Sequence, residues 1–166
     1  MYNEADIGNY KCDIAHSKAL EFLPQMNIER FNKKIECEQD IEDIIFDQDF
    51  VISAADIPRE KILDWVNKVC VKLKTPYICG GIDSQWATFY SIIPGVSGCM
   101  ECWKKQAKNT GPIYQDIVQE DLFVHSISSN VAIMPMTSIV SGLISSEFLK
   151  IVTKITEPAA LGQLCV

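Results

Sequence analysis

The chain has 166 residues, 48% of them hydrophobic and 22% charged, so it is long enough for one domain with a sizeable core. Its net charge of −7 excludes a general nucleic-acid binder, because its longest basic runs are Lys33-Lys34 and Lys104-Lys105. The polar N-terminus excludes a signal peptide, and seven cysteines, an odd number, argue against a disulfide framework and for reduced thiols in the cytoplasm.

Helical and strand-like patterns alternate along the first half of the chain. Apolar residues at helical spacing predict a helix from Ile7 to Leu23, which Pro24 ends. Alternating residues predict a short strand from Asn27 to Asn32, and a short acidic helix follows from Glu38 to Ile45. The apolar run from Asp49 to Ala55 is typical of a buried parallel strand.

The middle of the chain continues this alternation. Pro58 fits the first turn of a helix that Pro76 stops. Five residues of that helix form its apolar face: Ile62, Val66, Val69, Cys70 and Leu73. A buried strand is predicted from Tyr77 to Gly81, and a second strand from Ser84 to Gly95.

The last part of the chain is predicted to hold an irregular stretch, a helix and the start of a strand. These cover Lys105 to Asn130, Met136 to Ile155, and Leu161 to Val166. The helix is apolar on more than one face and contains several small residues. No membrane span is predicted, because the most apolar region, Val131 to Val152, is interrupted by a proline, several serines and Glu147.

Repeated strand–helix–strand order predicts an α/β fold with a mainly parallel sheet and helices on both faces. Ligands bind at the carboxyl ends of such strands, and the residues expected there are Asp56 and Gly80-Gly81. The sequence contains neither a GxGxxG nor a GxxxxGK[ST] phosphate loop, so a complete nucleotide site is not expected from these residues.

Cys99 and Cys102 have the spacing of one half of a tetrahedral zinc site. A Pro-Gly turn precedes the pair, which favours a zinc knuckle on a turn over a redox pair, since redox pairs usually open a helix. Inert thiols are the third interpretation. Cys165 and His125 are the nearby spare ligands, and with two thiolates alone we expect weak metal binding. The remaining cysteines are interpreted as ordinary: Cys12, Cys37, Cys70 and Cys79.

Five segments occur in an order that resembles a known family: "DIGNYKCDIA", "DFVISAADIPREKILDWVNKVC", "TPYICGGI", "SIIPGVSGCMECW" and "SIVSGLISSEFLKIVT". The sequence is similar to the ThiF/MoeB/HesA adenylating enzymes of the ubiquitin-activating superfamily, and particularly to the branch that activates peptides and small sulfur-carrier proteins. The resemblance covers nearly the whole chain.

The resemblance implies a Rossmann-like fold and an enzyme that uses ATP to convert the C-terminal carboxylate of a peptide or ubiquitin-like protein into an acyl-adenylate. It implies that Lys11 contacts the nucleotide phosphates and that Asp56 is catalytic and holds magnesium. It implies that Cys99 and Cys102 are a zinc half-site. The family is dimeric, and the two apolar faces of the last helix agree with a homodimer or a tight partner.

The family's glycine-rich nucleotide loop, its ribose-binding acid and its second cysteine pair have no counterpart in the sequence. The resemblance therefore implies that residues 1–166 are one domain, the middle-to-late part of an adenylating domain that is incomplete at both ends. We expect such a chain alone to be inactive. The alternative is a non-catalytic dimerisation or peptide-binding subunit of the same descent.

Two of the site residues keep a second interpretation. Asp56 lies close to Pro58, so it is either a magnesium ligand or the cap of the following helix. Lys11 lies in the first turn of its predicted helix, where it is either an ordinary exposed lysine or a phosphate contact.

Overall fold

The computed structural model describes residues 2–58, 61–82, 87–109, 133–163 and 165. The chain divides into two compact units, Met1–Ile35 and Glu36–Val166, and each is described by itself. The family resemblance placed the whole chain in one domain, and that assignment stays a prediction.

The first unit contains a 3-10 helix, η1 (Glu4–Asp6), and one α-helix, α1 (Lys11–Phe22). The helix begins four residues later than predicted, because Gly8 adopts a left-handed backbone with φ of 93°. The predicted strand from Asn27 to Asn32 is wrong: this segment is irregular. The segment is connected to α1 by side-chain contacts and not by strand pairing. These contacts are an Arg30–Asp13 ion pair of 3.2 Å and a hydrogen bond between Cys12 and Asn32.

The second unit is built on a three-stranded sheet in the order β1-β2-β3. β1 (Val51–Ser53) runs parallel to β2 (Tyr77–Ile82), and β2 runs antiparallel to β3 (Ala87–Ile92). The predicted α/β class is confirmed, but the sheet is mixed. Two strands so close in sequence pair antiparallel, since a parallel pair needs a crossover of a dozen or more residues.

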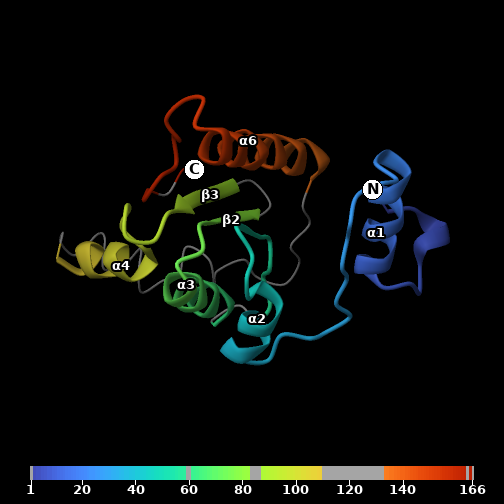
Figure 1. Cartoon of the computed structure of the whole chain (residues 1–166), viewed down its shortest axis with the longest axis horizontal. Coiled ribbons are helices and arrows are strands. Elements are labelled where there is room, and N and C mark those ends of the chain that lie inside the picture. Colours follow the sequence, from blue (N-terminus) through green and yellow to red (C-terminus); the bar gives the residue numbers. More distant parts are fainter. Residues whose placement is uncertain (1, 59–60, 83–86, 110–132, 164, 166) are drawn as a thin grey trace. The chain divides into compact units, whose positions relative to one another are not determined.

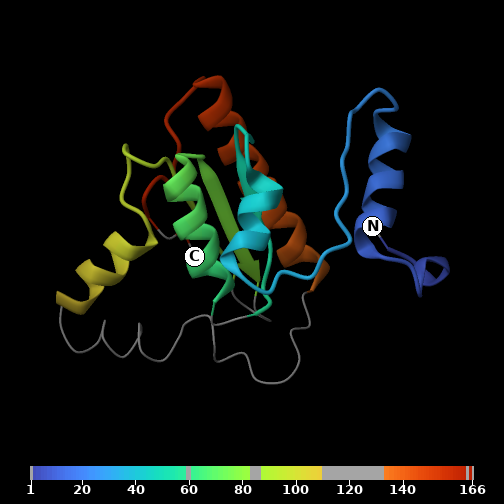
Figure 2. The same ribbon diagram turned by 60° about the horizontal axis from the view of Figure 1, so that its bottom comes forward.

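Helices cover both faces of this sheet. α6 (Met134–Thr153) lies on one face, while α2 (Glu38–Ile45) and α3 (Ile62–Leu73) lie on the other (Figure 1 and Figure 2). The predicted apolar stripe of α3 is largely confirmed, since four of its five residues are buried: Ile62, Val66, Val69 and Cys70. A further helix, α4 (Met100–Asn109), occupies the start of the stretch predicted to be irregular from Lys105, and the rest of that stretch lies outside the described residues.

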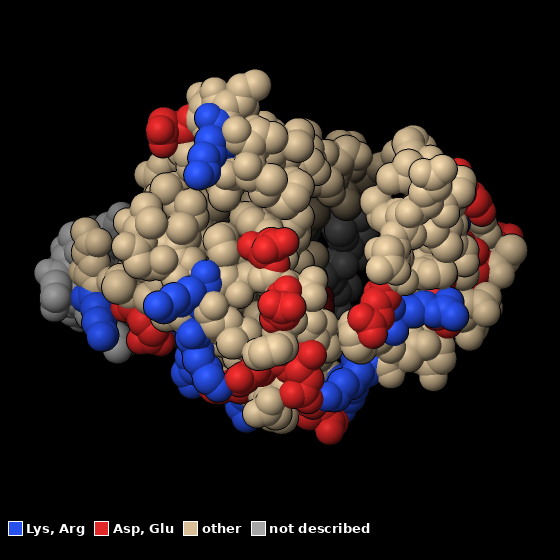
Figure 3. Space-filling model, in the orientation of Figure 1, with Lys and Arg blue, Asp and Glu red and all other residues tan. Residues whose placement is uncertain are grey.

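Charged side chains gather over α2 and α3. Two ion pairs join the helices, Lys68–Glu38 at 2.8 Å and Lys72–Glu42 at 2.7 Å. On the face shown in Figure 3, basic and acidic groups are interleaved, and the surface of α6 is mostly uncharged. The face in this view therefore has no broad basic patch of the kind that would attract nucleic acid.

α6 packs one side on β2 and β3 and leaves the other side apolar and exposed. Its two buried residues are Val140 and Glu147. By length and composition it is the one helix in the described ranges apolar enough to cross a membrane, with a mean hydropathy of 1.2. One such helix is a weak indication, because a helix that covers the core of a soluble protein meets the same criterion.

The segment after α6 returns to the sheet and runs beside β3. Cys165 and Phe89 exchange backbone hydrogen bonds of 3.0 and 2.9 Å, and the Gly162 N–H donates to the Ser91 carbonyl at 2.8 Å. The sequence predicted the opening of a strand here, and the structure confirms strand-like bridges to β3 although no regular strand forms.

Gly80 of β2 allows α6 to approach the sheet closely, which yields a stability prediction. A Cβ added at Gly80 would lie 2.4 Å from Cδ1 of Ile144. We expect Gly80→Ala to lower the free energy of unfolding by about 1 kcal/mol, because the side chain of Ile144 must leave its position. Urea unfolding with tryptophan fluorescence measures this loss.

Gly81→Ala is the matched control, because the nearest atom to its added Cβ is Thr88 Oγ1 at an ordinary 3.8 Å. Adding Ile144→Val to Gly80→Ala removes the clashing methyl group, so the double variant should lose less stability than the sum of the two single variants. Equal losses for the two glycine variants would contradict the close-packing explanation.

Candidate functional site

Asp56 is exposed and lies three residues beyond the carboxyl end of β1. Its carboxylate accepts no hydrogen bond within the described part of the chain. α3 begins at Ile62 after the N-cap residue Lys61, and the Ile62 N–H donates to the Pro58 carbonyl at 2.9 Å. Asp56 is therefore not the cap of α3, and its carboxylate oxygens remain available for a ligand.

Gly80 and Gly81 were expected at the carboxyl end of a strand, and the structure places both inside β2, in its last three residues. Gly80 pairs with Phe89 and Gly81 with Thr88. The small size of Gly80 permits the close approach of Ile144 on α6, whereas only Thr88 Oγ1 lies within 4 Å of where a Cβ of Gly81 would be. β1 and β2 are parallel, and Ser53 at the end of β1 pairs with Cys79. Asp56, which follows β1, and the glycines of β2 are therefore both at the carboxyl ends of their strands, where ligands bind in α/β sheets.

Lys11 is the first residue of α1, so it lies in the first turn of its helix as predicted although the helix begins later than predicted, and its side chain is exposed. No residue side chain caps this helix, since its N-cap residue, Tyr10, makes no capping hydrogen bond. An ammonium beside an uncapped helix N-terminus forms a positive environment that favours an anion. Lys11 belongs to the first unit and Asp56 to the second.

Cys99 and Cys102 converge, with their sulfur atoms 3.8 Å apart, as the zinc prediction requires. The pair does not lie on a simple turn, and this part of the prediction is wrong. Cys99 directly precedes α4, and its carbonyl accepts the Trp103 N–H at 3.0 Å, so the pair opens a helix. The redox interpretation was disfavoured because redox pairs usually open a helix. Since this pair does open a helix, that argument no longer separates a zinc site from a redox pair.

The start of the helix changes the chemistry of Cys99. Partial burial raises the pKa of this thiol, but nearby hydrogen-bond donors outweigh burial and hold the pKa below its ordinary value. These donors are the backbone N–H groups of Cys102 and Glu101, the Cys102 thiol and the Asn67 side chain. A thiol that ionises readily is suited to metal binding and to nucleophilic attack.

The thiols of Cys70 and Cys79 have the opposite character. Both are buried, and burial raises the pKa of Cys70 to about 12 and the pKa of Cys79 to about 11. They remain protonated at neutral pH and pack as apolar groups, which confirms their interpretation as ordinary residues.

Asn67 is a site residue that the sequence reasoning missed. It lies on α3 with 3% of its surface exposed, and its Oδ1 accepts hydrogen bonds from Tyr77 Oη at 2.7 Å and from the Met100 N–H at 3.0 Å. The sequence did contain a clue to it, because Asn67 directly follows Val66 and precedes Val69 and Cys70, which all belong to the predicted apolar face of the helix. A polar residue in that position is buried only with hydrogen-bond partners.

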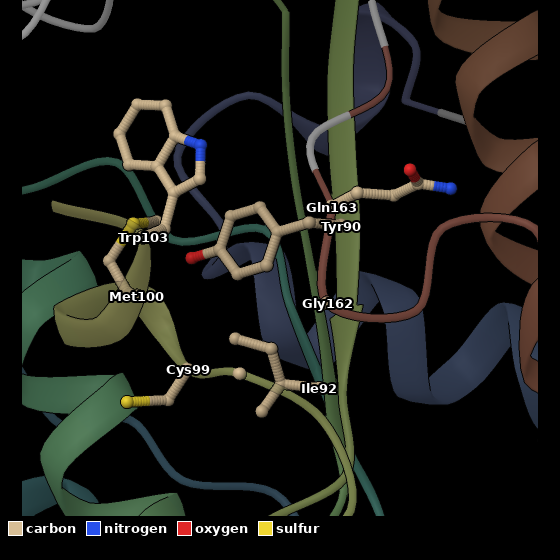
Figure 4. A pocket seen from close by; sticks show the side chains of 8 residues that line it. Tyr90, Ile92, Cys99, Met100, Trp103, Gly162 and Gln163 are labelled. Carbon is tan, nitrogen blue, oxygen red and sulfur yellow. The ribbon is translucent and has the colours of Figure 1, made fainter. Parts of the chain in front are cut away.

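An apolar pocket lies beside the cysteine pair, between β3, the start of α4 and the C-terminal segment (Figure 4). Tyr90 and Trp103 are its aromatic lining residues, and Gly162 and Gln163 line it from the C-terminal segment. The Tyr90 hydroxyl is buried and has no hydrogen-bond partner among the described residues. Figure 4 shows this hydroxyl pointing towards the side of the pocket formed by Trp103 and Met100.

The described residues contain no group of three or more His, Cys, Asp or Glu side chains able to hold a metal ion. Cys165 lies on the edge of β3, where burial and the nearby charge of Glu147 raise the pKa of its thiol. His125, the other spare ligand, lies outside the described residues. Cys99 and Cys102 therefore offer two soft ligands, which fits one half of a tetrahedral zinc site.

The fold agrees with the outcome of comparison with known proteins. The family profile of ThiF matches residues 1–166, and the chain belongs to the ThiF family.

Three solved structures show where the fold recurs. E. coli MccB with MccA-N7isoASN is 25% identical and has a TM-score of 0.79, with 98% of this chain and 47% of that chain covered. E. coli MccB with ATP is 22% identical and has a TM-score of 0.76, with 96% and 45% covered. Selenomethionine PaaA is 19% identical and has a TM-score of 0.68, with 98% and 53% covered. The chain spans about half the length of these proteins.

Proposed function

We propose that this chain is part of an adenylating enzyme that activates the C-terminal carboxylate of a peptide or of a ubiquitin-like or sulfur-carrier protein. Membership of the ThiF family over residues 1–166 carries the proposal. Asp56 supports it, because its side chain is exposed and does not cap α3, and because it follows the carboxyl end of β1, where ligands bind in α/β sheets. Solved structures of the similar MccB contain ATP in one case and MccA in another, which agrees with a nucleotide and a peptide as substrates.

In the proposed reaction, a carboxylate oxygen of the peptide attacks the α-phosphorus of ATP. A bond forms between that oxygen and phosphorus, the bond to the bridging oxygen of the β-phosphate breaks, and pyrophosphate leaves. The product is an acyl-adenylate. Enzymes accelerate such transfers mainly by positioning the reactants and stabilising charge.

Residues of this chain fit two of these tasks, binding of a magnesium ion and neutralisation of the phosphate charge. Asp56 would hold a magnesium ion, since its free carboxylate is the hard oxygen donor that this ion prefers. Bound magnesium supplies neutralisation of phosphate charge. The exposed ammonium of Lys11, at an uncapped helix start, would pair with phosphate oxygens.

Cys99 and Cys102 would hold zinc in a structural role, with both thiolates as ligands. Two ligands leave the tetrahedral shell of zinc half filled, so tight binding requires further ligands from Cys165, another segment or a partner. The distance of 3.8 Å between the sulfur atoms suits a shared metal.

A second candidate function is a non-catalytic dimerisation or peptide-binding subunit. The outward side of α6 favours it, since Ile139 is 57%, Leu143 46% and Leu149 55% exposed. An apolar helix face of this kind commonly packs against a partner, and we propose a second copy of this chain. Sedimentation at micromolar concentration measures the association, and a single monomeric species would contradict it.

ATP–pyrophosphate exchange tests the enzymatic proposal. The full-length gene product should exchange labelled pyrophosphate into ATP when a suitable peptide or carrier protein is added, and residues 1–166 alone should not. A control peptide with an amidated C-terminus removes the attacking carboxylate and should give no exchange. A full-length product that binds such peptides but never exchanges pyrophosphate would favour the binding subunit.

A further inference from the structure

We propose that Asn67 is the positioning residue of the Cys99–Cys102 pair, and that the convergent dithiol it holds binds soft, thiophilic ligands through both sulfurs. The inference rests on the proposed metal half-site but not on adenylation. It assigns a task to a buried polar side chain of α3 that neither the fold nor the reaction has used.

The Oδ1 atom of Asn67 fixes the start of α4. Met100 is the first residue of that helix, and its N–H donates to Asn67 Oδ1 at 3.0 Å. The first N–H groups of a helix have no partner inside the helix, and a nearby residue usually caps them. Here α3 supplies the cap, and the peptide group that it holds joins Cys99 to Met100.

Asn67 is itself held in place. Tyr77 Oη donates to the same Oδ1 atom at 2.7 Å, and Tyr77 is fully buried at the start of β2. This bond fixes the Asn67 side chain relative to the sheet. Burial of both residues makes the arrangement rigid, because a buried polar group that loses its partner is costly.

A second contact ties α4 to α3 one turn further along. Lys104 Nζ lies 2.5 Å from Asp64 Oδ1, and Asp64 precedes Asn67 by three residues on α3. Both side chains are about one-third exposed, so this ion pair contributes little. The bond to Asn67 is the buried one and directly adjoins Cys99, so we assign the positioning to it.

Convergence of the two sulfurs is the property that this contact maintains. One sulfur belongs to the residue before α4 and the other to the first turn, so they approach to 3.8 Å only while the helix begins at Met100. A dithiol already in this geometry binds a bridging atom without the entropic cost of ordering its two arms.

Phenylarsine oxide is the probe for this property. Its arsenic forms bonds to two sulfurs, both S–H bonds break, and the oxygen leaves as water with no change of oxidation state. We expect Asn67→Ala to weaken its binding about fivefold or more, the effect of losing a helix cap. Asn67→Ser serves if the alanine variant does not fold, since a helix serine can donate to the carbonyl four residues before it.

Two variants separate positioning from a general loss of structure. Asn67→Asp keeps an acceptor for the Met100 N–H but removes the amide donor that lowers the pKa of Cys99, so we expect binding weaker than that of the wild type but tighter than that of Asn67→Ala. Tyr77→Phe removes the other bond to the same oxygen and should have a smaller effect than Asn67→Ala. Cys102→Ser leaves no Cys99–Cys102 pair, so its affinity for phenylarsine oxide is the baseline for binding to other thiols. Near-ultraviolet circular dichroism checks that each variant is folded.

Wild-type affinity in a folded Asn67→Ala or Asn67→Ser protein would overturn the inference. A loss in Asn67→Asp as large as in Asn67→Ala would also overturn it, because the acceptor would then not be what matters. Wild-type protein that binds no tighter than Cys102→Ser would show that the sulfurs do not converge. That result removes the half-site and this inference together but leaves adenylation, which pyrophosphate exchange measures, untouched.

Discussion

Asp56→Ala is expected to abolish adenylation, with a fall of about a hundredfold or more in pyrophosphate exchange by the full-length gene product. The carboxylate is exposed and makes no hydrogen bond within the described residues, so its removal takes away a proposed magnesium ligand and no packing. The free energy of unfolding should change by less than about 0.5 kcal/mol. Pyrophosphate exchange and urea unfolding of the same preparation provide both numbers.

Asp49→Ala is the matched control for this prediction. Asp49 is also exposed, but it precedes β1 and so lies at the opposite end of the strand, away from the expected ligand. It should retain exchange. A folded Asp56→Ala protein that exchanges as fast as the wild type would show that our assignment of Asp56 is wrong.

Glu147→Ala is expected to cause the largest loss of stability, about 3 kcal/mol in the free energy of unfolding. Glu147 is 2% exposed, and its carboxylate accepts the Ala159 N–H at 3.0 Å and the Ala160 N–H at 2.5 Å. It also accepts the Ser91 hydroxyl at 3.4 Å. Alanine would leave these donors without an acceptor and open a cavity between α6 and β3.

Urea unfolding measures this loss, and two further variants interpret it. Glu147→Gln keeps one acceptor oxygen but turns an amide N–H₂ group towards a backbone donor, so about half of the loss should remain. Glu157→Ala removes an exposed carboxylate from the segment that follows α6 and should be nearly neutral. Equal stability of the Glu147→Ala protein and the wild type would mean that the segment is held by its bridges to β3 alone.

Local patterns in the sequence predicted the elements whose form depends on hydrophobic burial. The stripe of α3 and the apolar run of β2 each have one dominant way to bury their side chains, so periodicity was sufficient. The apolar run of β1 does form a strand parallel to β2, but the prediction that it is buried is wrong, since Ile52 is 51% exposed. The segment from Asn27 to Asn32 also alternates, but a strand exists only where a neighbour pairs with it, and no described segment does.

The candidate site was predicted in part for a similar reason. The spacing of Cys99 and Cys102, with two residues between them, allowed the prediction that their sulfurs converge, and the turn of helix that begins at Met100 brings the sulfurs to 3.8 Å. The spacing did not predict that they open α4, since the cap of that helix comes from Asn67, 33 positions earlier in the chain. Asp56 illustrates the converse: its capping interpretation depended on where α3 begins, and Lys61 occupies that position.

Glu147 ties the irregular segment after α6 to that helix through the N–H groups of Ala159 and Ala160. Ala160 is fully buried although it belongs to no helix or strand, and its N–H donates to a carboxylate on α6 while its carbonyl accepts from Ser91 of β3. Hydrogen bonds therefore join α6 to the segment and the segment to β3. Opening any one of these three elements would expose buried donors in the other two, so we expect their amide protons to exchange with solvent together.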